Sequence, residues 1–404
     1  MRAILRLAWR NLWRHPQRTL LMIAIVAFGT FCVIVVWGFT DGWMKTMTSA
    51  QVSLDQGDLK VFARGYRADP APENGLSPKS LDRALEEIGK LPQARATPRL
   101  SFFGMVKSAY GAVGAEIRGI DPLGERKVTV LHERVVEGHW LSGPGEILLG
   151  ERLARELDVR VGERVVVIAQ GEKGPVSRAF RAVGLFSSGL PALDKSTAFI
   201  TIEDARALTG FSGATEIVVR LPSDSPQAVA KRLQESLGEG VEVWDFFALN
   251  PMIREFVRIS WIELTPLIAI LALLSGFGVA NTVLFSVLER TRELGVMSAL
   301  GMSPRRLARM VLAESLLASA LGYGVGAVAG YIVNLFLATH GWSFGEAFSE
   351  MLGQAGMPAV LYSSVSGWYW LGSLSVVVAT GLIAAWYPAR RAARLPPVQA
   401  IREG

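Results

Sequence analysis

The residues best suited to chemistry lie in one charged stretch between two apolar segments, Leu288–Leu316. Gly301, with Ser303 as an N-cap and Pro304 at a first helical position, predicts that one short helix ends there and another begins. Charges on a short, well-capped helix suit ionic contacts with another protein. The alternative is an ordinary loop that holds its flanking helices by charge. Seven ionisable side chains fall within 21 residues: Glu289, Arg290, Arg292, Glu293, Arg305, Arg306 and Arg309.

Patterns typical of catalysis and of metal binding are absent from the sequence. It contains no GxxxxGK[ST] phosphate-binding loop and no HExxH zinc motif, and its four histidines are scattered. The single Cys32 permits no intrachain disulfide and no thiolate cluster. No charged residue lies at the centre of an apolar run, where an ion-coupled carrier keeps such groups. We therefore expect a non-enzymatic chain with no catalytic or metal-binding residues of its own, which draws energy from elsewhere.

Four apolar runs are long enough to cross about 30 Å of hydrocarbon as helices. Half of the residues are hydrophobic and the mean hydropathy is +0.31, as in a membrane protein with a sizeable soluble part. The first run is longer than the roughly 7–15 residues of a secretory signal core, which predicts a retained span. Gly322, Gly326 and Gly330 predict a close helix contact, either between subunits or within the chain. The runs are Thr19–Thr40, Leu264–Leu288, Ser315–Leu337 and Trp368–Tyr387.

Arginine is concentrated in three segments that flank these runs. Five arginines and no acid precede the first run, five arginines and two glutamates follow the second, and four arginines and one glutamate follow the fourth. Asp41–Glu263 carries 28 Lys+Arg against 30 Asp+Glu, and Ala338–Gly367 has no Lys or Arg. The positive-inside rule then places both termini and the middle loop in the cytoplasm. Met1–Arg18 predicts an interfacial helix whose Leu5, Trp9, Leu12 and Trp13 face the acyl chains.

The region between the first two runs alternates between strand and helix patterns, which predicts one α+β domain or two subdomains. Helical spacing of apolar residues continues to about Gln56 and from Phe246 to Glu263, which predicts a stalk of two helices. The expected strands are Gly57–Ala63, Arg99–Lys107, Glu116–Gly119, Glu146–Leu149, Arg164–Ala169, Phe180–Phe186, Ala198–Thr201, Glu216–Leu221 and Val241–Trp244. The expected helices are Ser80–Leu91, Glu151–Leu157, Ile202–Leu208 and Pro226–Leu237.

The expected fold is an α-helical membrane protein with four transmembrane helices plus a large α+β extracytoplasmic domain inserted between helices 1 and 2. We expect a cytoplasmic interfacial helix (1–18), transmembrane helix 1 with its stalk (19–56), the extracytoplasmic domain (57–245), and a second stalk with transmembrane helix 2 (246–288). A cytoplasmic coupling loop (289–310), transmembrane helix 3 (311–337), an extracytoplasmic loop (338–367), transmembrane helix 4 (368–388) and a cytoplasmic tail (389–404) follow.

Four groups of residues form a joint pattern, namely Glu289–Gly295 with Ala299-Leu300-Gly301, Ala8–Leu12 with Arg18-Thr19, Gly145–Ala169, and Tyr387–Ala393 with Pro397–Ala400. Together they resemble the FtsX/MacB-type ABC transporter permeases. Val183–Asp194 is particularly similar to the lipoprotein-releasing LolC/LolE branch. Two departures are Ser298, where relatives often have Arg or Lys, and the short loop Gly171–Arg178, where that branch has a Pro-rich hook.

The resemblance implies a permease subunit, in the bacterial cytoplasmic (inner) membrane, of an ATP-driven mechanotransmission transporter. Such a transporter extracts or exports a lipoprotein, lipid or other amphiphile without carrying it through the membrane. It implies that ATP and Mg bind to a separate ABC ATPase subunit present in two copies. The other implied partner is a second permease, identical or paralogous. No nucleic-acid partner is implied. The residues it assigns to ATPase coupling are Glu289, Arg290, Arg292, Glu293, Leu294, Gly295, Ala299, Leu300 and Gly301.

An amphiphile that enters from the membrane would meet aromatic residues at the outer ends of the first two runs. For any one of them, an interfacial aromatic belt is the alternative explanation. Two other functions fit the same architecture, namely an FtsX-like transmembrane regulator of a cell-wall hydrolase and a passive channel or adhesion scaffold. The candidate substrate residues are Trp37, Phe39, Trp43, Phe256 and Trp261.

Overall fold

The computed structural model describes residues 2–171, 174–222, 225–343, 345 and 360–394. They form two compact units. A helical unit comprises Met1–Lys45, Phe256–Trp342 and Leu361–Gly404, and an α+β unit comprises Thr46–Glu255 and Ser343–Val360. The C-terminal motif Pro397–Ala400 and half of the expected outer loop (338–367) lie outside the described residues.

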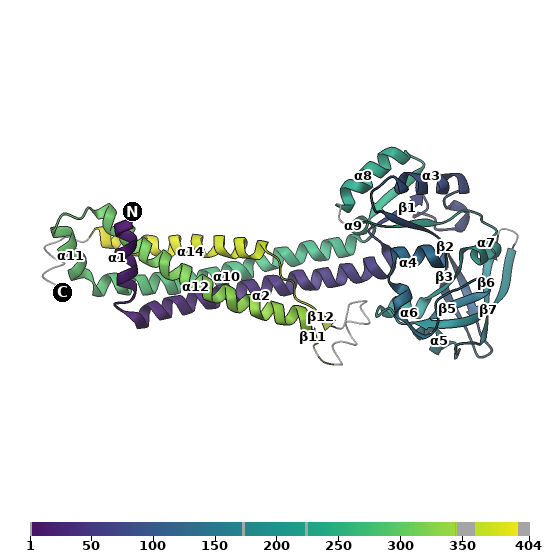
Figure 1. The fold of residues 1–404 in the computed structure, drawn as a ribbon, viewed down its shortest axis with the longest axis horizontal. Coiled ribbons are helices and arrows are strands. Elements are labelled where there is room, and N and C mark those ends of the chain that lie inside the picture. Colours follow the sequence, from purple (N-terminus) through teal and green to yellow (C-terminus); the bar gives the residue numbers. More distant parts are fainter. Residues whose placement is uncertain (1, 172–173, 223–224, 344, 346–359, 395–404) are drawn as a thin grey trace. The chain divides into compact units, whose positions relative to one another are not determined.

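The helical unit is built from long apolar helices and two short ones at one end (Figure 1). Among the described residues, four helices are long and apolar enough to cross a membrane, and the four expected runs fall within them. Prolines at first helical positions, where a missing N–H costs nothing, begin three of them at Pro16, Pro251 and Pro304. The helices are α1 (Arg2–Leu12), α2 (Pro16–Gln51), α10 (Pro251–Glu289), α11 (Thr291–Ala299), α12 (Pro304–His340) and α14 (Trp368–Ala393).

The structure changes three expected features of these helices. The second stalk helix begins at Pro251 rather than Phe246, because Asn250, which precedes a proline, leaves the helical conformation after the short helix α9 (Phe246–Leu249). The first stalk helix ends in a wider π-helical turn, η1 (Val52–Gln56). Trp9 and Trp13 of α1 are exposed as expected, but Leu12 is buried among core side chains of the helical unit.

The glycine stripe of α12 packs against α2 of the same chain. A Cβ at Gly326 would overlap the Ala27 carbonyl oxygen, and one at Gly322 would lie 2.8 Å from the Ile23 carbonyl oxygen. Gly330 approaches Ile34 in the same way. The three glycines therefore let the two backbones approach more closely than any side chain would permit.

The α+β unit contains one mixed sheet with the strand order β10-β1-β9-β2-β3-β8-β5-β7-β4, and β6 pairs with β2 and β7. Three hydrophobic clusters lie along it (Figure 1). One lies under α5 (Glu151–Glu156) and α7 (Ile202–Thr209), and the second lies under α3 (Pro78–Gly89) and α8 (Pro226–Leu237). The third contains Phe186, Leu193 and Phe199. The strands are β1 (Leu59–Ala63), β2 (Arg95–Lys107), β3 (Ala112–Ile120), β4 (Val135–Gly138), β5 (Glu146–Gly150), β6 (Arg164–Gly171), β7 (Gly174–Phe186), β8 (Thr197–Thr201), β9 (Glu216–Arg220) and β10 (Val241–Asp245).

The helices of this unit follow the expected pattern with two additions. The expected helices appear as α3 (Pro78–Gly89), α5 (Glu151–Glu156), α7 (Ile202–Thr209) and α8 (Pro226–Leu237). The sequence analysis missed α4 (Pro122–Val128), α6 (Pro191–Ser196) and the edge strand β4. These are short and β4 is mostly exposed, so they carry too few apolar residues to show a period.

Candidate coupling and docking site

The charged stretch forms α11, a short helix held between two long ones. Arg290 occupies the position before its first residue, and Gly301, with φ of +91°, ends the turn after it. The Gly301 and Met302 amides donate to the carbonyl oxygens of Ser298 and Met297, which closes this turn. Ser303 begins α12, although its side chain makes no capping hydrogen bond. The orientation of α11 is therefore fixed at both ends.

Arg290 does not project into the solvent but lies at the centre of a buried network. It is 7% exposed, and its Nη1 lies 3.1 Å from Oε2 of Glu314 on α12. Its Nε donates to Glu293 across 3.2 Å, and Asn11 of α1 donates to the other Glu314 oxygen across 2.6 Å. A buried guanidinium needs such partners, since leaving one unpaired costs several kcal/mol (about 3–5). Glu314 lies one residue before the third apolar run, but its side chain is only 14% exposed.

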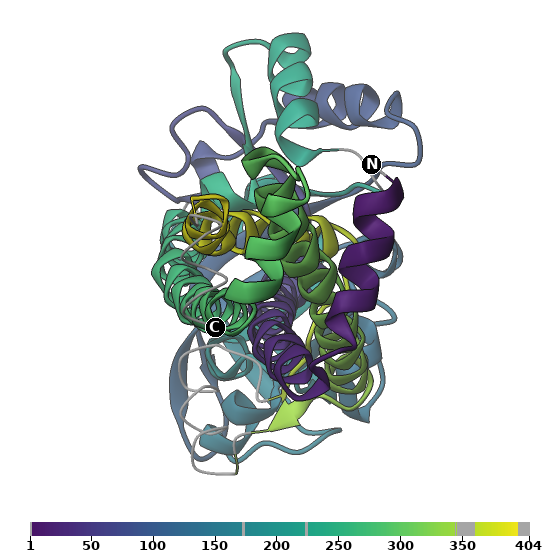
Figure 2. The ribbon, with the colours of Figure 1, turned by 90° about the vertical axis from the view of Figure 1, so that its left-hand side faces the viewer.

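Two more ion pairs connect the junction of α10 and α11 to the N-terminal segments. Arg18 of α2 pairs with Glu289, the last residue of α10, and Arg14 lies 3.4 Å from Glu293 of α11. Both pairs are partly exposed, so each contributes little stability on its own. With the Arg290 network, they connect α11 and the end of α10 to α1, α2 and α12 at the end of the helical unit that faces the viewer in Figure 2.

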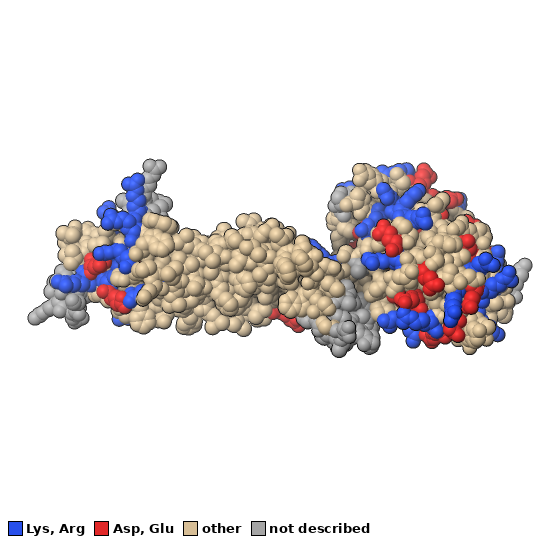
Figure 3. All heavy atoms as spheres, turned by 60° about the horizontal axis from the view of Figure 1, so that its bottom comes forward, with Lys and Arg blue, Asp and Glu red and all other residues tan. Residues whose placement is uncertain are grey.

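The nine residues assigned to ATPase coupling divide between two faces. Leu294 and Gly295 are buried with Arg290, whereas the remaining six are exposed. Leu300 is 83% exposed. Figure 3 shows that the charged side chains of the helical unit gather at this end, whereas most of the length beyond it is uncharged on that face. The exposed members are Glu289, Arg292, Glu293, Ala299, Leu300 and Gly301.

An open groove of about 720 Å³ runs between α1 and α11. Its walls combine the cations Arg10, Arg14 and Arg292 with apolar side chains such as Val296. Mixed apolar and charged surfaces of this kind are typical of protein interfaces, in which Arg is enriched. The arrangement can therefore receive another protein, and its firm base can pass on a displacement.

The candidate substrate residues form two aromatic groups. Trp37 and Trp261 both contact Trp368, at centroid distances of 5.1 Å and 5.7 Å, and Trp43 packs edge-on against Phe256 at 5.9 Å. Phe39 is half-buried and belongs to neither group. Trp368, which the sequence analysis did not select, connects residues from α2 and α10.

Two protein-family models match this chain. The model of the MacB-like periplasmic core domain matches residues 19–236, more than half of the chain, and that of the FtsX-like permease C-terminal region matches residues 267–397. The chain belongs to the family of MacB-like and FtsX-like permeases. It is thus an ABC transporter permease of the type that includes MacB, LolC and LolE.

Individual relatives of this permease cover most of its length. It is 25% identical over 413 residues to the lipoprotein-releasing system transmembrane protein LolC of Neisseria meningitidis, covering 95% of this chain and 94% of that protein. The macrolide export ATP-binding/permease protein MacB of Escherichia coli is 28% identical over 98% of this chain, which spans 60% of that protein. Among solved structures, the periplasmic region of MacB from Actinobacillus actinomycetemcomitans matches 48% of this chain and 92% of that chain with a TM-score of 0.35 and 14% identity.

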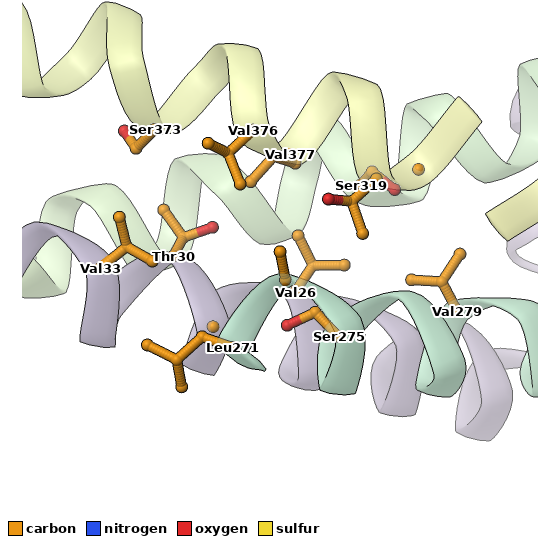
Figure 4. Close-up of a pocket in the computed structure, with 14 residues that line it drawn as sticks. Val26, Thr30, Val33, Leu271, Ser275, Val279, Ser319, Ser373, Val376 and Val377 are labelled. Carbon is orange, nitrogen blue, oxygen red and sulfur yellow. The ribbon is translucent and has the colours of Figure 1, made fainter. Parts of the chain in front are cut away.

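A small cavity lies inside the helical unit of the permease, between α2, α10, α12 and α14 (Figure 4). Its volume is about 30 Å³, enough for one or two water molecules but not for an acyl chain. The buried hydroxyls of Thr30 and Ser319 line it and have no hydrogen-bond partner within the described part of the chain. Among those residues, no group of three His, Cys, Asp or Glu side chains is placed to hold a metal ion.

The α+β unit of the permease contains a buried ionic cluster that the sequence analysis missed. At its centre, the fully buried Arg99 of β2 forms a two-pronged pair with Glu125 of α4, with distances of 2.6 Å and 3.1 Å. Its Nη1 also lies 3.0 Å from Asp55, in the turn that extends α2, and Asp55 pairs with Arg118 as well. The members are Asp55, Lys60, Arg99, Glu116, Arg118, Glu125 and Glu216.

The charges in this cluster stabilise its carboxylates. Burial alone would raise the pKa of Asp55, but Arg118, Arg99 and Lys60 outweigh burial and hold that pKa well below its usual range. At Glu216, burial would likewise raise the pKa, but Lys60 and the same two arginines outweigh burial. The pKa of Glu216 is therefore also lowered. Close to the cluster, Asn250 donates to the Gln56 side chain across 2.5 Å. The end of the first stalk segment is thereby bound to the sheet and to the start of the second.

Proposed function

We propose that this chain is the permease subunit of an ATP-driven mechanotransmission transporter in the bacterial cytoplasmic membrane, which extracts or exports an amphiphile with a separate ATPase subunit. The observation that carries this proposal is the exposed face of α11 on a buried ionic base. Such a helix moves as one body with α1, α2 and α12 when a partner displaces it. The arginine-rich segments at the same end support a cytoplasmic position for α11, and the α+β unit then lies outside the membrane.

The substrate class that we propose is a lipoprotein or another lipid-anchored amphiphile. Support comes from the relatives named as lipoprotein-releasing proteins, LolC and LolE, which match nearly the whole of this chain and are matched over nearly their whole length. The cavity within a single helical unit is too small for such a substrate. We therefore propose that the aromatic groups around Trp368 and Trp43 contact it, on a surface shared with the second permease.

The ATPase-docking role is best tested at Leu300, because this side chain is exposed and is not part of the ion-pair network that holds α11. Glu293→Lys would also disturb the pairs with Arg14 and Arg290, whereas Leu300→Glu changes only the exposed face. We expect about 30-fold weaker binding of the ABC ATPase that co-purifies with the wild-type chain, since a lost anchor side chain costs about 2 kcal/mol. Leu123→Glu, at a similarly exposed leucine of the α+β unit, is the matched control.

The outcome is read by affinity purification and by the ATPase activity of the reconstituted complex. Unchanged ATPase binding by the Leu300→Glu variant would refute docking through α11. Co-purification of a cell-wall hydrolase, without ATP-dependent release of a fluorescent lipopeptide from proteoliposomes, would instead support the regulator function.

A further inference from the structure

A basic groove lies in the α+β unit between the end of β9, the start of β2 and α4. Its volume is about 720 Å³, within the range of small-molecule binding sites. Four cations line it, Arg95, Arg126, Lys127 and Arg220, and Glu133 is the one carboxylate among the lining residues. Because Asp41–Glu263 as a whole carries 28 Lys+Arg against 30 Asp+Glu, this excess of positive charge is local.

Two of these cations face each other across the sheet. Arg95 of β2 is directly opposite Arg220 of β9 in an antiparallel pair, and like charges at such positions are destabilising. Arg220 Nε lies 3.5 Å from Asp58, but its Nη1 is buried and has no hydrogen-bond partner within the described part of the chain. His132, which also lines the groove, has a buried Nδ1 without a partner among the described residues. The Arg220 guanidinium therefore has a donor that the described residues leave unsatisfied, beside the second guanidinium of the groove.

The other two cations stand on the last turn of α4. Arg126 and Lys127 are exposed there and interact favourably with the carbonyl end of the helix. That position accounts for their presence on the helix. Their side chains nevertheless add two positive charges to a groove that already contains the arginine pair. A ligand with a single carboxylate would not need four cations.

A second cross-strand arginine pair in the same sheet provides a comparison. Arg164 of β6 is directly opposite Arg181 of β7, and both side chains are exposed. Water and salt screen such a pair, so opposed arginines alone do not indicate a ligand. The Arg95–Arg220 pair differs because it lines a groove with two further cations and a buried, unpartnered guanidinium nitrogen.

We propose that this groove binds a phosphoryl group that carries two negative charges, either on the headgroup of an anionic lipid or on a soluble phosphate compound. Guanidinium groups bind phosphate oxygens through paired, charge-assisted hydrogen bonds, and two opposed arginines can bind one phosphate from both sides. The proposal does not depend on the ATPase or on the transport cycle, because it concerns binding to the α+β unit alone.

The test uses the full chain in a neutral detergent and compares four probes by calorimetry. They are inorganic phosphate, short-chain phosphatidic acid, short-chain phosphatidylcholine and a hexapeptide of glutamate. We expect Arg95→Gln/Arg220→Gln to weaken binding of phosphatidic acid by about 10-fold to 100-fold, as loss of charged hydrogen bonds does. Arg164→Gln/Arg181→Gln, which removes an equal charge from the same sheet, should leave binding unchanged.

Each outcome bears on the proposal. Tight binding of phosphatidic acid with weak binding of inorganic phosphate assigns a lipid headgroup, and equal binding of the two assigns a soluble phosphate. Equal loss of binding in both double variants, binding of neither phosphate probe, or tighter binding of the glutamate peptide overturns it. The thermal midpoint of Arg95→Gln/Arg220→Gln should change little, since the substitution removes both a repulsion and one partly exposed ion pair with Asp58. Arg126→Gln/Lys127→Gln, at exposed positions, provides a second variant with the same expected loss.

Discussion

Replacement of Asp55 by asparagine removes one charge from the buried ionic cluster and leaves the shape of the side chain almost unchanged. The carboxylate lies 3.0 Å from Arg99 and also pairs with Arg118, and both guanidinium groups are buried. The neutral amide cannot balance either of them. We therefore expect the α+β unit to lose stability although no apolar contact is lost.

The expected magnitude follows from the partners that remain. Removing one member of a buried pair costs about 3–5 kcal/mol. Arg99 keeps Glu125 at 2.6 Å, and Arg118 keeps Glu116 at 2.8 Å, which places the loss near the lower limit, about 3 kcal/mol. For a unit of about 200 residues, this corresponds to a fall of roughly 6–12 °C in its thermal midpoint.

The assay is calorimetric unfolding of the purified full chain, with hydrogen-exchange mass spectrometry to assign the transition to the α+β unit. Asp82→Asn is the control, because Asp82 is an exposed aspartate on α3 and its replacement should cost less than about 0.5 kcal/mol. If Asp55→Asn lowers the midpoint no more than Asp82→Asn does, the cluster does not stabilise the unit and the reasoning fails.

Three further predictions concern pH and packing. The folded-state pKa values of Asp55 and Glu216 are lowered. Their contribution to stability should therefore be complete above their unfolded-state pKa values of about 4 and be lost as the pH falls below those values. Acid unfolding of the full chain measures this loss. Gly326→Ala should lower the thermal midpoint in detergent through a clash with Ala27, whereas Gly324→Ala, where a Cβ meets nothing within 4 Å, should leave it unchanged or raise it. Asn334→Leu removes the hydrogen bond to the Ile34 carbonyl oxygen and should cost about 1 kcal/mol, and an unaltered midpoint would show that this bond contributes nothing.

The outline of the fold could be predicted because it depends on local patterns. Uncharged runs such as Leu264–Leu288 are long enough to show a membrane helix, and Ser303-Pro304 marks a helix start whatever surrounds it. Alternation in segments such as Arg164–Ala169 was sufficient to locate most strands. The same patterns could not show that Asn250 interrupts the second stalk, since its neighbours keep helical spacing on both sides.

The candidate site depended on contacts that no local pattern reveals. Glu314 is bound by Asn11, 303 residues away in the chain, so its burial follows from tertiary packing alone. Arg99 lies in a strand that was predicted, but a strand pattern treats an arginine as a solvent-facing residue. An observation that could have raised the question is Glu216, a charged residue at the start of a strand whose next three residues are apolar.

The two buried arginine networks indicate why charges are kept where apolar packing would be cheaper. Well-packed hydrophobic residues in place of a buried ion pair are often equally stable or more stable, so stability alone does not explain Arg99 or Arg290. Ion pairs also fix relative orientation, because a guanidinium group that is paired with carboxylates on several elements sets the angles between those elements. Arg290 does this for α11, α12 and α1 through Glu314, and Arg99 does it for β2, α4 and the turn that ends the first stalk segment. In each unit, the buried arginine lies where a connecting helix meets the packed body, which is where a transmitted displacement would otherwise be lost to bending.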